Sequence, residues 1–199
     1  MNYPEFFKKV EPILLYDPLA DFLGAVENGE IEINYLDVVK FAGHSCPTVA
    51  GAYLMTKLGL KKLYGDSLPV RGEIKIMVKG AKNEGVEGVI GNTIAFICGV
   101  SEEGGFKGIG GKFNRANKLL FSQDIPKEIR LQRTDNGTFV DISYAPTIAP
   151  DPRQQQLMQK IMTNQATKEE KDLFKKLWQE RVKKILLSKE KWAQMVDID

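Results

Sequence analysis

A proline-rich segment at residues 145–152 divides this chain into two parts of different character. The segment holds three prolines within eight residues. Proline lacks a backbone N–H and cannot continue a helix or a central strand, so the segment marks a boundary. Residues 153–196 beyond it contain neither glycine nor proline. The sequence therefore predicts a domain over residues 1–150 and a helical extension over residues 151–199.

The extension has the pattern of a long amphipathic helix. Thr167 is followed three residues later by Glu170, the signature of a capping box at a helix start. Lysines and acidic residues alternate on the face opposite the apolar one, which is typical of a solvated face on a docked helix. We expect it to pack on its own core or on a second subunit, and a membrane-surface helix is the alternative. The apolar residues recur at spacings of three and four: Leu173, Phe174, Leu177, Trp178, Val182, Ile185 and Leu186.

The first 150 residues predict helices near the amino terminus followed by strands. Helix-start signals and apolar periodicity predict helices over residues 18–26 and 34–41 and from Pro47 onward. Alternation predicts a strand over 71–78 and a hairpin of 129–133 with 139–144. The predicted fold class is α+β, with a mostly antiparallel sheet packed against the N-terminal helices.

A glycine-dense stretch at residues 85–121 is less regular. We expect a helix or tight turn around Asn92–Cys98, a loop at Ser101–Gly105 and an irregular strand from Phe106. Glycines at 104–111 leave backbone N–H groups able to wrap an anion, with charge from Lys107, Lys112 and Arg115. Lys112 and Arg115 are therefore candidate cofactor-binding residues, and a flexible loop or bulged strand is the alternative.

Charge and hydropathy limit the kinds of partner that we expect for this protein. The 28 basic and 26 acidic residues leave a net charge of +2, which gives no argument for nucleic acid. The longest apolar stretch, Val89 to Val100, is interrupted and falls short of the ~20 residues that span a bilayer. The amino terminus shows no secretory pattern. We expect a cytoplasmic protein without membrane contact, whose cysteines are reduced thiols or metal ligands.

The chain has a single histidine and two cysteines, and this scarcity excludes several chemistries. A disulfide framework, a four-cysteine zinc ribbon and a multi-histidine metal centre are all excluded. Any imidazole chemistry must use His44.

His44 and Cys46 lie two residues apart, directly before a predicted helix that starts at Pro47. Residues two apart in an extended segment point to the same side, so imidazole and thiol can meet one metal ion. A cysteine at a helix N-cap also lies at the positive end of the helix dipole, which favours the thiolate.

Cys98 is the natural third metal ligand, because three protein ligands leave one position of a tetrahedral zinc ion open. A cysteine in an apolar run is, however, commonly a small packing residue. A Cys46–Cys98 redox pair is a further alternative. The predicted metal ligands are thus His44, Cys46 and Cys98.

The segment from Phe41 to Gly51, with Gly43-His44-Ser45-Cys46-Pro47 at its centre, resembles the signature of the FmdE-like domain family, which is named after formylmethanofuran dehydrogenase. Two further segments, residues 16–20 and 111–114, resemble the bacterial branch of that family. The resemblance implies an α+β domain that binds a transition metal, with zinc as the expected ion, through His44, Cys46 and a later cysteine, here Cys98. It also implies a homodimer.

The chain departs from that family pattern at several places, including the region of Glu87–Asn92, where the acidic and cysteine positions expected before the later cysteine are not evident. Ala42 stands where the family often has a second histidine, and Thr48 stands where it often has glycine. The C-terminal zinc ribbon that many members carry is replaced by the helical extension.

These observations predict a protein that binds Zn²⁺ or another transition metal, with an open coordination position for a small-molecule ligand or substrate. Such a metal would polarise a carbonyl or activate water if the protein is an enzyme. The alternative is a non-catalytic metal-binding, sensing or accessory module that acts through dimerisation.

Overall fold

The computed structural model describes residues 2–199. Its helices in chain order are η1 (Glu5–Lys9), α1 (Pro18–Phe22), η2 (Glu27–Gly29), α2 (Tyr35–Ala42), α3 (Pro47–Tyr64), α4 (Glu87–Cys98), α5 (Arg153–Met162), α6 (Lys168–Leu187), η3 (Lys189–Lys191) and α7 (Trp192–Met195). Its strands are β1 (Ile13–Tyr16), β2 (Glu30–Ile33), β3 (Ile74–Val78), β4 (Leu119–Leu120), β5 (Ile129–Arg133), β6 (Phe139–Tyr144) and β7 (Val196–Ile198).

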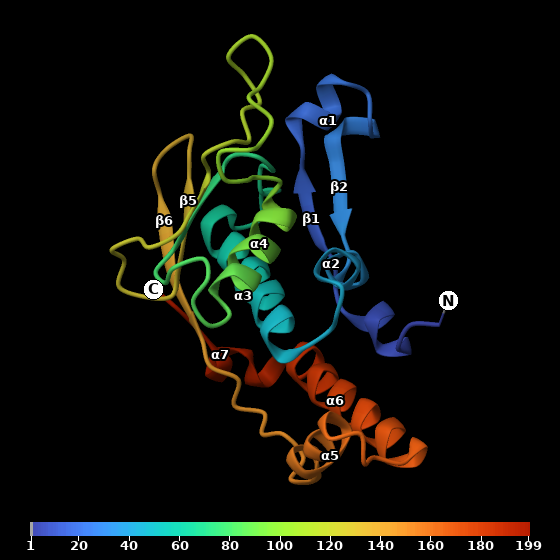
Figure 1. Cartoon of the computed structure of the whole chain (residues 1–199). Helices are drawn as coiled ribbons and strands as arrows, with labels where there is room; N and C mark the ends of the chain where they lie inside the picture. Colours follow the sequence, from blue (N-terminus) through green and yellow to red (C-terminus); the bar gives the residue numbers. More distant parts are fainter. Residues whose placement is uncertain (1) are drawn as a thin grey trace.

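The strands form two sheets, which confirms the α+β class (Figure 1). An antiparallel pair, β1 and β2, forms an arm on one side of the molecule. The larger sheet has the strand order β4-β3-β5-β6-β7. Its β3–β4 pair is parallel and the other pairs are antiparallel, so this sheet is mixed. The predicted hairpin of β5 and β6 is confirmed.

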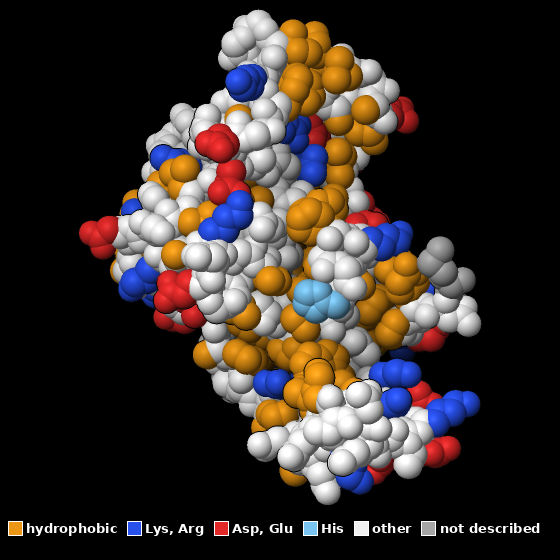
Figure 2. All heavy atoms as spheres, in the orientation of Figure 1, with side chains coloured by type: hydrophobic (Ala, Val, Ile, Leu, Met, Phe, Trp, Pro, Cys, Tyr) orange, Lys and Arg blue, Asp and Glu red, His pale blue; other side chains and the backbone are white. Residues whose placement is uncertain are grey.

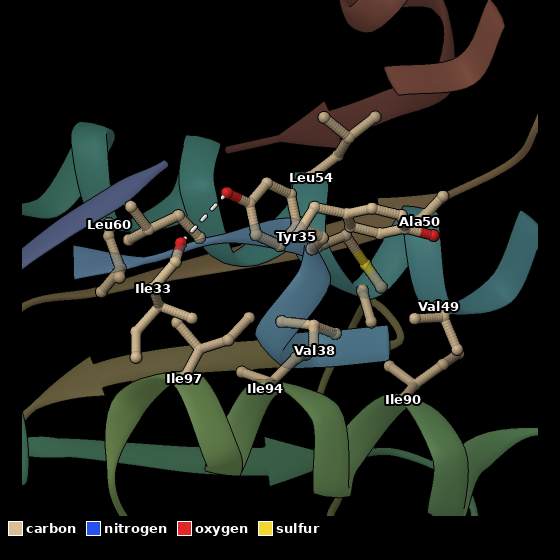
Figure 3. Close-up of a cluster of buried hydrophobic side chains, with 14 of the residues drawn as sticks. Ile33, Tyr35, Val38, Val49, Ala50, Leu54, Leu60, Ile90, Ile94 and Ile97 are labelled. Carbon is tan, nitrogen blue, oxygen red and sulfur yellow. Dashed lines mark hydrogen bonds between the residues drawn. The ribbon is translucent and has the colours of Figure 1, made fainter. Parts of the chain in front are cut away.

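Helix α3 packs on this sheet and carries much of the core on its other side. Gly59 lies so close to β5 and β6 that a Cβ there would be 2.6 Å from Ile142 Cδ1 and 2.8 Å from Leu131 Cδ1. Ile90, Ile94 and Ile97 of α4 point toward α2 and α3 (Figure 3). The long apolar stretch at Val89–Val100 is therefore largely core packing.

The N-terminal helix signals are confirmed, with one difference in length. Asp17 caps α1, its Oδ1 accepting hydrogen bonds from the N–H groups of Leu19 and Ala20 at 3.0 Å. The helix ends at Phe22 and not at Val26, because Gly24 adopts a positive φ of 65° that turns the chain away.

The glycine-dense stretch is part helix and part loop. Helix α4 includes the expected helical segment Asn92–Cys98. The prediction of an irregular strand from Phe106 is wrong, because Gly108, Gly110 and Gly111 all have positive φ and bend the chain into a tight turn. A reciprocal pair of backbone hydrogen bonds between Ile109 and Lys112 closes this turn.

The C-terminal extension packs on the chain's own core. The capping box of Thr167 and Glu170 starts α6 as predicted. Val182, Ile185 and Leu186 of α6 are buried in the same apolar cluster as α3. Strand β7 then joins the main sheet beside β6. The domain boundary at residue 150 remains a prediction. In the structure, the residues before and after it pack closely together.

Candidate functional site at the start of helix α3

The segment from Gly43 to Cys46 links two helices and holds the chain's only histidine. Gly43 adopts a left-handed conformation, φ 75°, that ends α2. Cys46 is extended and caps α3, and its Sγ accepts the N–H of Val49 at 3.4 Å. Pro47 opens the helix, so the predicted N-cap and first-turn assignments are confirmed.

His44 is exposed at the surface, where it is the pale-blue residue in Figure 2. Its Nδ1 lies 2.9 Å from the carbonyl oxygen of Ala42. A carbonyl can only accept a hydrogen bond, so this contact places the proton of a neutral imidazole on Nδ1. The Nε2 lone pair is then directed away from this contact, in the tautomer in which histidine commonly binds a metal.

Two tyrosines lie beside this segment, Tyr35 buried and Tyr144 partly buried. The hydroxyl of Tyr35 is 3.0 Å from Ser45 Oγ, and the hydroxyl of Tyr144 donates to the carbonyl oxygen of Pro47 at 3.1 Å. Burial raises the pKa of both phenols well above the ordinary value, so both remain protonated at neutral pH. Tyr144 also fills the space left by Gly51 of α3, where a Cβ would lie 2.2 Å from its ring.

Helix α6 fixes the same segment from the other side. Trp178 Nε1 and Gln179 Nε2 both donate to the carbonyl oxygen of Ser45, at 2.9 and 3.2 Å. The extension therefore helps to define the candidate site.

Sequence reasoning missed Tyr35, Tyr144, Trp178 and Gln179. Trp178 belongs to the apolar stripe of the extension, and Tyr144 ends an alternating strand. Each pattern indicates packing and gives no information about which distant residue is contacted.

Cys98 lies in a different environment. It is the last residue of α4 and is fully buried in the apolar core. Burial raises the pKa of its thiol to about 12, although Arg71 opposes this shift. Neither cysteine forms a disulfide. Among residues 2–199, no three His, Cys, Asp or Glu side chains are grouped so that they could hold a metal ion. The structure therefore does not bring Cys98 together with His44 and Cys46.

The two candidate cofactor-binding residues lie in the glycine-rich loop region. Lys112 is exposed in the turn. Arg115 is engaged in the fold, donating to Asp17 Oδ1 at 2.6 Å and to the carbonyl oxygen of Gly99 at 3.1 Å. No hydrogen bond or ion pair within the described residues joins either one to the segment with His44. Their role in binding an anion remains a prediction.

Asp17 is the centre of a buried ion network. Only 2% of the residue is exposed, and Arg71 and Arg115 both pair with its carboxylate. Burial would raise the pKa of this carboxyl, but hydrogen bonds from Arg115, Ala20 and Arg71 lower it below the ordinary value overall. The network ties α1 to the end of α4, because Arg71 also donates to the carbonyl oxygens of Phe96 and Ile97.

The fold and this site define an α+β protein in which a His-x-Cys segment opens a central helix. The sequence model of the family described as "FmdE, Molybdenum formylmethanofuran dehydrogenase operon" matches residues 41–192. This is more than half of the chain, so the protein belongs to the FmdE family. The matched range includes both the His44–Pro47 segment and most of the extension. No curated protein matches the chain. Within residues 2–199, no helix has the length and apolar character that a membrane span requires.

Proposed function

We propose that the protein binds Zn²⁺ or another transition metal at the start of α3, through His44 Nε2 and Cys46 Sγ, and presents it to a small-molecule ligand. The observation that carries the proposal is the contact of His44 Nδ1 with the carbonyl oxygen of Ala42. It fixes the tautomer that leaves Nε2 as a ligand, two residues from a thiol.

The donor set fits a transition metal, because imidazole and thiolate are ligands that zinc prefers. Cys46 is partly exposed, and thiolate is the form in which a cysteine binds a metal. Cys98 differs, because its thiol is buried in the core. We therefore propose that water or ligand oxygens complete the coordination, and keep Cys98 as a third candidate to be tested.

The metal, when bound, would supply a Lewis acid that polarises a carbonyl or activates water. The residues of this chain hold the proposed metal-binding segment in place. The protonated hydroxyl of Tyr35 contacts the Ser45 hydroxyl, and that of Tyr144 donates to the carbonyl oxygen of Pro47. Trp178 and Gln179 hold the carbonyl oxygen of Ser45, which restricts the positions that His44 and Cys46 can occupy.

Metal analysis of the purified protein tests this proposal. Wild-type protein purified with added zinc should carry stoichiometric metal, and His44→Ala and Cys46→Ser should each lose it. Cys98→Ala, if it folds, tests that residue separately: unchanged metal content removes Cys98 from the ligand set. Wild-type protein without stoichiometric metal after this preparation would refute the metal site.

A second candidate is a non-catalytic metal-binding, sensing or accessory module that acts through a homodimer in the cytoplasm. Exposed apolar side chains favour an interface: Phe22 and Leu23, at the end of α1, are 62% and 60% exposed. Cobalt substitution separates the two candidates. An absorption spectrum that changes when small ligands are added indicates an open site, whereas an inert spectrum favours the module. Light scattering measures the oligomeric state.

A further inference from the structure

A pocket of about 460 Å³ opens beside His44. It is lined by three parts of the chain that are distant in sequence: the N-terminal segment with Phe7, the region from Val39 of α2 to Ser45, and helices α5 and α6. In Figure 2, hydrophobic side chains gather beside and below the histidine on this face. The volume lies within the range of small-molecule binding sites, which is about 300–1,000 Å³.

The lining is mainly apolar and in part aromatic. Phe174 and Trp178 lie on one wall, with ring centroids 5.6 Å apart. Met162 of α5, which also lines the pocket, is 75% exposed. Methionine adapts its shape to a ligand, and aromatic rings give a large contact area at low entropic cost.

The charges that line the pocket have one sign. Lys175 is the cation of the lining, and the lining residues include no carboxylate. Lys175 does pair with Asp172 at 2.9 Å outside the lining, but both side chains are more than half exposed. Such an exposed pair contributes little and can exchange partners.

We propose that this pocket binds a small organic acid with an apolar, aromatic body, whose carboxylate pairs with Lys175. The inference rests on the proposed function in one respect only, which is that the bound acid would lie beside a metal-binding histidine. The apolar walls and Lys175 do not depend on the metal.

Calorimetric titration with 4-phenylbutyrate tests the proposal, with the uncharged 4-phenylbutan-1-ol as the matched compound. We expect saturable binding of one 4-phenylbutyrate per chain, tighter than that of the alcohol. The fluorescence of Trp178 should change during the titration in a Trp192→Phe background. Equal affinity for acid and alcohol, or the absence of saturable binding, would overturn the proposal.

Two pairs of variants locate the ligand. Lys175→Glu should weaken 4-phenylbutyrate binding about fivefold or more and leave the alcohol unaffected, because it reverses the charge that meets the carboxylate. Lys176→Glu, the neighbouring exposed position on α6, is the control for net charge. Met162→Asp should weaken the binding of both compounds, whereas Gln156→Asp on the exposed face of α5 should leave the binding of both unchanged. Equal effects within either pair would place the binding elsewhere.

Two further measurements distinguish the acid site from the metal site and from a dimer interface. Cys46→Ser should retain 4-phenylbutyrate binding even when it loses the metal, so the two proposals can fail independently. If Met162→Asp changes the oligomeric state measured by light scattering, a second copy of the chain covers the pocket and the small-acid site is refuted.

Discussion

Trp178 donates its indole N–H to the main-chain carbonyl oxygen of Ser45, 133 residues earlier in the chain. This hydrogen bond ties the C-terminal extension to the segment between His44 and Cys46. It gives the extension a part in positioning the candidate site, in addition to covering the core.

Trp178→Phe should therefore affect both stability and metal binding. Loss of the indole donor should lower the free energy of unfolding by about 1 kcal/mol and weaken zinc binding. Trp192→Phe is the matched control, because Trp192 Nε1 also donates to a backbone carbonyl, that of Ile185 at 3.1 Å. Denaturant unfolding and zinc titration measure the two effects. Equal loss of zinc affinity in both variants would show that the effect is general destabilisation.

Gly51→Ala should destabilise the protein by about 1–3 kcal/mol, because its new Cβ would overlap the ring of Tyr144. Gly104→Ala is the control, since a Cβ at Gly104 meets no atom within 4 Å. Thermal unfolding of the two variants measures the difference. If Tyr144→Leu restores stability to the Gly51→Ala variant, the overlap is the cause. An equal and small effect at both glycines would contradict the close helix–ring approach.

Asp17 should make the protein sensitive to acid. Its pKa in the folded state is lowered, so its stabilisation is complete above the unfolded-state pKa of about 3.9 and is lost as the pH falls through the lower folded-state pKa. At pH 7, Asp17→Asn should lower the free energy of unfolding by about 3 kcal/mol or more, because it leaves two arginines without their buried partner. It should also flatten the dependence of stability on pH below about 4.

Urea unfolding at several pH values measures this dependence. Asp135→Asn is the control, because Asp135 pairs with Arg133 at a half-exposed position. This substitution should lower the free energy of unfolding by less than about 1 kcal/mol. A pH profile that is the same in wild type and Asp17→Asn would show that other carboxyl groups govern acid unfolding.

The two cysteines should differ in reactivity. Cys46 is partly exposed, whereas Cys98 is fully buried with a pKa raised to about 12, so it stays a protonated thiol in the native protein. Ellman's reagent at pH 8 should modify one thiol per native chain and two after denaturation. Cys46→Ser should abolish the native reaction. Rapid modification of both native thiols would mean that Cys98 is accessible and would strengthen it as a candidate metal ligand.

Local sequence signals predicted much of the fold. Asp17, Cys46 and Thr167 start helices as expected because a cap depends on neighbouring residues. The β5–β6 hairpin was predicted for the same reason, since its turn lies between the strands. The three-residue strand β7 lacks such a local signal, and it forms because β6 offers it a partner.

The candidate site was predicted only in part. His44 and Cys46 are close in sequence, so their common position could be read directly. The partners that hold them come from distant segments, and Arg115 illustrates the general difficulty. Its charge suggested an anion site, but it pairs with Asp17, which lies 98 residues earlier. Only the tertiary fold determines which opposite charge a buried arginine meets.

The order of strands in the main sheet also bears on how the protein avoids aggregation through its sheet edges. Its two outermost strands, β4 and β7, have only two and three residues, whereas the inner strands have five or six. The outermost strands are where unpaired backbone groups invite another chain to add a strand, and short ones offer little template. The fold thus gives each of its longer strands a neighbour on both sides and leaves only short strands at the edges, where a fibril-like stack could otherwise grow.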